Sequence, residues 1–81
     1  MDRKQLEYEV IALDKAIDEG PGDAQLYLLR GRAHYKLGQL DSALNDFVRV
    51  RELDPGNVEA GEYVAMISEI FDFQYKDTYN V

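Results

Sequence analysis

The chain has 81 residues, no cysteine and a formal net charge of −7, from 16 acidic and 9 basic residues. A chain of this length forms one small domain, and without cysteine it has no disulfide and no thiolate metal site. The acidic excess argues against nucleic acid and anionic membrane surfaces as partners, because both carry negative charge.

Membrane insertion and secretion are not expected from the sequence. No apolar run approaches the ~18 residues that a membrane-spanning helix needs. The first residues mix charged and apolar side chains, which differs from a signal peptide. Together with the absence of cysteine, this favours a cytoplasmic protein.

Hydrophobic residues recur at helical spacing in four segments, and no segment alternates with the period of two that a strand requires. We therefore predict helices over residues 3–19, 24–37, 40–53 and 58–71. The connections between them are so short that successive helices must lie antiparallel. The fold class predicted from this pattern is all-α.

Helix-terminating and helix-capping residues support these boundaries. Gly20 to Gly22, Gly38 and the Asp54-Pro55-Gly56 turn separate the segments. Asp23 and Asn57 can cap the helices that follow them. Beyond residue 71 the helical pattern ends, and we expect an aromatic tail over 72–81. Some of its aromatic side chains should pack back on the helices.

Residues 24–57 carry a motif as well as a periodicity. Gly31, Ala43, Phe47 and Pro55 stand at fixed spacing, together with Tyr27, Tyr35 and Gly38. This block resembles the tetratricopeptide repeat, a pair of antiparallel helices. Gly31 and Ala43 are small enough to let the two helices approach closely, while Phe47 fills the space beside them.

The flanking segments resemble parts of the same repeat. Residues 1–23 look like the second helix of a preceding repeat, and 58–71 like the first helix of a following one, which would cap the stack. The resemblance thus implies a single domain over 1–81, a short α-solenoid of stacked hairpins. It also implies a non-catalytic role in protein–protein interaction.

Arg30 and His34 depart from the usual pattern of the repeat, and Arg30 has an acidic counterpart in Asp46. Arg30 and Asp46 are placed symmetrically about the turn. Each lies eight residues from the turn at Gly38, one before it and one after it. Antiparallel helices place such residues level with each other, so we predict an ion pair across the hairpin.

Few residues suggest catalysis. His34 is the single histidine and has no carboxylate three or four residues away, so we interpret it as a packed, hydrogen-bonded side chain. Pairs of acidic residues at helical spacing are expected to be solvated. They are Asp14 with Asp18, Glu59 with Glu62, and Glu69 with Asp72. We predict no enzyme activity, no cofactor and no metal site.

The resemblance implies that the first helix of each repeat lines a concave binding side. Within residues 24–37, Arg32 and Lys36 are i, i+4 neighbours beside Leu28, and this stripe favours an acidic peptide. The candidate partner-binding residues are Gln25, Leu28, Leu29, Arg32, Tyr35 and Lys36.

An alternative function remains open at this point. Repeat arrays generally need about three repeats to bury a continuous core, so the two terminal helices each lack a neighbour. A second copy of the chain would cover these open faces. The sequence is therefore compatible with a monomer or a weak homodimer, and with self-assembly in place of peptide binding.

Overall fold

The computed structural model describes the backbone of residues 2–20 and 22–79 and the side chains of these residues up to Phe73. Four helices follow one another, α1 (Arg3–Glu19), α2 (Ala24–Lys36), α3 (Leu40–Leu53) and α4 (Val58–Tyr79). Within the described backbone there is no strand, and the all-α prediction is confirmed.

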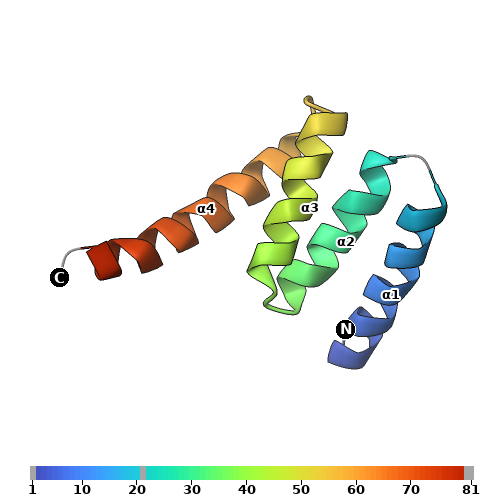
Figure 1. The fold of residues 1–81 in the computed structure, drawn as a ribbon, viewed down its shortest axis with the longest axis horizontal. Helices are drawn as coiled ribbons and strands as arrows, with labels where there is room; N and C mark the ends of the chain where they lie inside the picture. Colours follow the sequence, from blue (N-terminus) through green and yellow to red (C-terminus); the bar gives the residue numbers. More distant parts are fainter. Residues whose placement is uncertain (1, 21, 80–81) are drawn as a thin grey trace.

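The helices are arranged in chain order, with α1 at one end of the molecule and α4 at the other (Figure 1). Each packs mainly against the helix before and after it, which is the arrangement of stacked hairpins rather than of a four-helix bundle. No helix in the described part of the chain is long and apolar enough to span a membrane.

Capping side chains begin the helices where the sequence predicts. Asp23 Oδ1 accepts a hydrogen bond from the backbone N–H of Gln25 at 2.9 Å, and Asn57 Oδ1 accepts one from Ala60 at 2.9 Å. Gly38 ends the first hairpin helix with φ = 77°, a left-handed conformation that glycine adopts without strain. Local chemistry therefore sets these boundaries.

Helices α2 and α3 approach each other tightly at Gly31. A Cβ atom added there would lie 2.9 Å from the ring of Phe47, so only glycine fits without a shift of that ring. Phe47 and Ala43 are both 0% exposed. The predicted crossing is confirmed.

Phe47 also contacts α4. Its ring stacks on Tyr63 with a centroid separation of 4.3 Å and an interplanar angle of 1°. The main core forms around this contact and contains Leu28, Ala43, Phe47, Val50, Ala60 and Ile67. A smaller cluster of Leu6, Ala33 and Leu37 joins α1 to α2.

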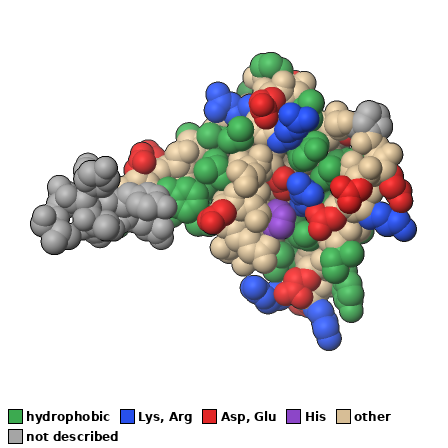
Figure 2. All heavy atoms as spheres, viewed as in Figure 1, with side chains coloured by type: hydrophobic (Ala, Val, Ile, Leu, Met, Phe, Trp, Pro, Cys, Tyr) green, Lys and Arg blue, Asp and Glu red, His purple; other side chains and the backbone are tan. Residues whose placement is uncertain are grey.

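Arg30 links three helices through two carboxylates. Its Nε and Nη2 atoms donate to Asp46 of α3 at 2.9 and 2.7 Å, and Nη1 donates to Asp14 of α1 at 2.8 Å. The predicted pair between Arg30 and Asp46 is confirmed. Asp14 was expected to be solvated, but it accepts a hydrogen bond from Arg30. Asp46 is buried, and its hydrogen bonds are the main cause of a raised Arg30 pKa. On the side of the molecule drawn in Figure 2, acidic and basic side chains lie next to one another.

Helix α4 differs from the prediction at its C-terminal end. It continues to Tyr79 rather than ending at residue 71 and giving way to a tail. No glycine or proline follows Gly61, so nothing in the sequence breaks the helix. Phe71 packs against the core as expected, but Phe73 is 71% exposed and does not fold back. The side chains of Tyr75 and Tyr79 lie outside the described residues.

Replacing Phe47 tests this packing. We expect Phe47→Ala to lower the free energy of unfolding by about 3–5 kcal/mol, because it removes the ring between Gly31 and Tyr63 and leaves a cavity. Val48→Ala is the matched control, since Val48 is 42% exposed on the same helix and its truncation should cost less than about 1 kcal/mol. Urea unfolding followed by circular dichroism measures both. Equal losses in the two variants would contradict the packing described.

Candidate functional site

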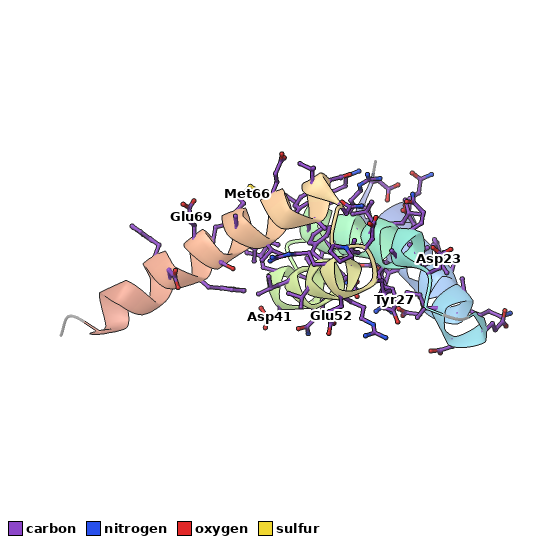
Figure 3. The ribbon with its side chains drawn as sticks, turned by 90° about the horizontal axis from the view of Figure 1, so that it is seen from above. Asp23, Tyr27, Asp41, Glu52, Met66 and Glu69 are labelled. Carbon is purple, nitrogen blue, oxygen red and sulfur yellow. The ribbon has the colours of Figure 1, made fainter. Side chains whose placement is uncertain are left out.

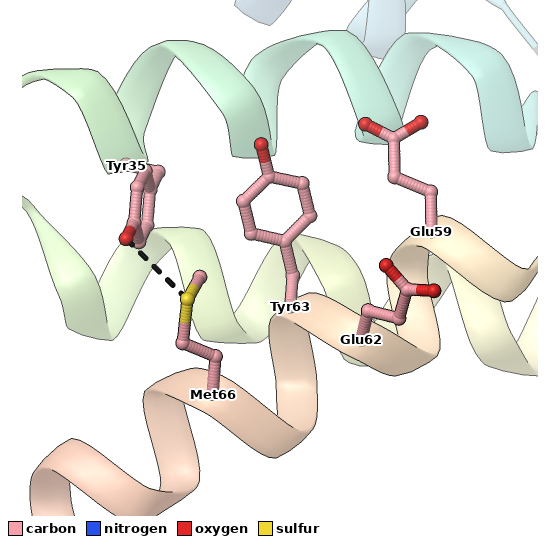
Figure 4. Close-up of a pocket in the computed structure, with 5 residues that line it drawn as sticks. All are labelled: Tyr35, Glu59, Glu62, Tyr63 and Met66. Carbon is pink, nitrogen blue, oxygen red and sulfur yellow. Dashed lines mark hydrogen bonds between the residues drawn. The ribbon is translucent and has the colours of Figure 1, made fainter.

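A hollow of about 410 Å³ opens between α2 and α4. Tyr35 lines it from α2, and the other lining residues come from α4 (Figure 4). They are Glu59, Glu62, Tyr63 and Met66. Because α3 lies against both helices, the hollow is closed from behind by the hairpin.

Aromatic and sulfur-containing side chains form the apolar part of the hollow. Tyr35 and Tyr63 meet edge to face with their ring centroids 5.2 Å apart. The Tyr35 hydroxyl donates to Met66 Sδ at 3.7 Å, as the dashed line in Figure 4 marks. Since Tyr63 also stacks on the buried Phe47, these side chains are fixed by the core beneath them.

An ion pair between α2 and α4 forms one end of the site. Arg32 Nε donates to Glu59 Oε2 at 2.7 Å, and Arg32 Nη2 donates to Glu59 Oε1. The guanidinium lowers the pKa of the Glu59 carboxyl below its usual value, and the carboxylate raises the pKa of Arg32. The sequence analysis expected Glu59 to be solvated, but its carboxylate is paired with Arg32. This bidentate contact joins the two helices.

The six residues expected from sequence do not form one surface. Tyr35 lines the hollow, and Arg32 contacts it through its pair with Glu59. Gln25 and Lys36 are exposed elsewhere on α2. Leu28 is only 4% exposed and belongs to the core, so the surface stripe expected beside Arg32 is wrong at this position. Leu29 is partly buried.

The sequence analysis missed the α4 side of the hollow. Glu59, Glu62, Tyr63 and Met66 stand one repeat length after Gln25, Leu28, Leu29 and Arg32. Extending the repeat numbering into residues 58–71 would have identified them. A second hollow of about 540 Å³ continues along α4, lined by Met66, Glu69, Ile70 and Phe73.

His34 lies outside the hollow, with Nδ1 2.7 Å from Gln39 Oε1 and Nε2 3.9 Å from Asp46 Oδ2. It is hydrogen-bonded as predicted. Among the described residues, no cluster of three or more acidic, histidine or cysteine side chains could hold a metal ion.

The fold is thus a short stack of antiparallel helix hairpins with a hollow between alternate helices. Residues 24–57 match the family model described as tetratricopeptide repeat. This segment is therefore a tetratricopeptide repeat, with α2 and α3 as its two helices. Proteins built from such repeats bind partners on concave surfaces.

The chain is similar to Protein CTR9 homolog from Arabidopsis thaliana. The relative is 46% identical to this chain over 65 residues, which cover 79% of the chain but 6% of that protein. The chain thus corresponds to a small part of that relative's length. No solved structure matches the chain.

The ion pair between Arg32 and Glu59 predicts a pH dependence. Folding lowers the pKa of Glu59, so the stabilisation is complete above the ordinary glutamate pKa of about 4.3 and is lost as pH falls through the lower folded-state pKa. We expect Glu59→Gln to be less stable than the wild type near pH 7, with a difference that shrinks as the pH falls below the ordinary glutamate pKa of about 4.3. Urea unfolding at several pH values measures it. A difference that does not change with pH would contradict the prediction.

Proposed function

We propose that this chain is a non-catalytic interaction module that holds a segment of a partner protein in the hollow between α2 and α4. The observation that carries the proposal is the position of the hollow, between the first helix of the repeat and the equivalent helix that follows it. This is the side on which repeat arrays of this kind bind their partners.

The apolar part of the hollow suits a single apolar side chain of the partner. Met66 is 38% exposed and lies beside two tyrosine rings whose positions are fixed by contact with each other and with Phe47. A preformed contact surface loses little conformational entropy when a ligand binds. The area is small, so we expect a Kd in the micromolar range or weaker.

The charges favour a different partner from the acidic peptide expected from sequence. That expectation used Arg32 and Lys36 together, but Arg32 is already paired with Glu59. Glu62 adds a carboxylate to the lining, so the hollow itself carries negative charge. We infer that the partner segment places a basic residue beside Glu62 and an apolar residue next to Met66, while Lys36 alone still favours an acidic residue further along α2.

Two probe peptides with the same Leu-Phe core test this proposal, one flanked by lysines and the other by glutamates. We expect the lysine-flanked peptide to bind about twofold to fivefold more tightly, the ratio that exposed ion pairs produce. In a nuclear magnetic resonance titration of the labelled protein, the shifted resonances should belong to Tyr35, Tyr63 and Met66.

Two matched pairs of variants sharpen the result. Met66→Ser should weaken binding, whereas Val48→Ser, at a similarly exposed apolar position on α3, should not. Glu62→Lys should remove the preference for the lysine-flanked peptide, and Glu52→Lys on α3 should leave it unchanged. Shifts confined to α1 or α3, or equal effects within each pair, would overturn the proposal.

A further inference from the structure

The outward face of α1 carries an apolar pair between two lysines. Lys4, Tyr8, Ile11 and Lys15 follow each other at i, i+4, i+7 and i+11, which defines one stripe of a helix. Tyr8 is 64% exposed and Ile11 63% exposed. The buried Leu6 lies on the opposite side of α1, against α2. We call these four residues the α1 stripe.

One face of α4, over residues 62–73, carries a stripe with the same residue spacing and the opposite charge. Glu62, Met66, Glu69 and Phe73 again follow i, i+4, i+7 and i+11, and Ile70 lies beside them. Met66 and Glu69 leave α4 on the same side (Figure 3). Three of these residues and Ile70 line the second hollow. We call the four residues the α4 stripe.

We propose that the α1 stripe of one copy of this chain docks on the α4 stripe of a second copy. Each stripe covers about 16 Å of helix, so the two match in length. Contact would cover Tyr8 and Ile11 with Met66, Ile70 and Phe73. With the two helices parallel, Lys4 would lie level with Glu62, and Lys15 would lie about one helical turn beyond Glu69. The ion pairs found among the described side chains use none of these four charged residues, so their charges are available to a partner.

Charge also selects the orientation of the two copies. Each copy carries −7 overall, so most encounters between copies are repulsive. The two stripes bring opposite charges together, and complementary patches of this kind fix the register of an interface. Asp18 and Glu19 follow Lys15 and lie at the edge of the contact, which keeps the association weak.

The positions of the two stripes determine the kind of assembly. Helices α1 and α4 lie at opposite ends of a molecule with a longest dimension of 46 Å (Figure 1). One copy therefore leaves both of its own stripes uncovered. Head-to-tail contact of this kind is heterologous and adds copies in series. This contact between copies does not require a partner segment in the hollow between α2 and α4. Glu62 and Met66 belong both to that hollow and to the α4 stripe.

Sedimentation equilibrium with charge-reversed variants tests the proposal. At concentrations from ~10 µM to ~1 mM, the range in which a small exposed interface associates, the wild-type mass should rise above 9.3 kDa. Lys4→Glu with Lys15→Glu should remain monomeric, and so should Glu62→Lys with Glu69→Lys. An equimolar mixture of these two variants should associate in alternating series, because the two intact stripes pair with each other and so do the two reversed stripes. The variant with all four reversals should associate again.

Two controls change the net charge by the same amount outside the stripes. They are Lys36→Glu with Arg51→Glu, and Asp41→Lys with Glu52→Lys, all at exposed positions. Both should associate as the wild type does, and circular dichroism verifies that every variant is folded. A wild type that stays monomeric at ~1 mM would overturn the proposal, as would association of the reversed variants or loss of association in the controls. A mixture that stays monomeric would overturn it as well.

Discussion

The ring of Phe47 lies between the backbone of α2 at Gly31 and the ring of Tyr63 on α4. This single side chain of α3 therefore sets how closely α2 approaches α3 and how α4 is placed behind them. Tyr63 then meets Tyr35 edge to face, and Tyr35 bonds to Met66. The hollow between α2 and α4 is built on this series of contacts, so its shape depends on the packing of Phe47.

Two arginines of α2 add directional contacts around that packing. Arg30 joins α2 to α1 and α3 through Asp14 and Asp46, and Arg32 joins α2 to α4 through Glu59. Both guanidinium groups are therefore used within the chain. These two basic residues of α2 are therefore neutralised in the fold, and the hollow between α2 and α4 is more acidic than the residues of α2 alone suggest.

Local features of the fold could be predicted from the sequence. Capping by Asp23 and Asn57, the left-handed Gly38 and the Gly31–Phe47 contact follow from neighbouring residues or from the repeat motif. The end of α4 was missed because loss of the apolar stripe was taken as the end of the helix, although no breaking residue stands there.

The candidate site was harder to predict because it depends on contacts between distant residues. The pairing of Arg32 with Glu59 joins two helices that are not neighbours in the chain, and no local pattern indicates it. Leu28 has the spacing of the surface stripe, but the approach of α3 buries it. The sequence thus located the α2 side of the site, and the repeat numbering also leads to its α4 side, whereas the charge of the site required the fold.

The most direct test of this account is a distance measurement between α2 and α4. The chain has no cysteine, so spin labels can be attached at introduced cysteines in place of Gln25 and Glu69, and at Gln25 and Asp41 as a reference for the α2–α3 hairpin. With Tyr63 present, both pairs should give narrow distance distributions. In Tyr63→Ala, the α2–α4 distribution should broaden while the α2–α3 distribution stays narrow. An α2–α4 distribution that stays equally narrow without the tyrosine ring would show that the Phe47–Tyr63 stack does not place α4, and would contradict the account.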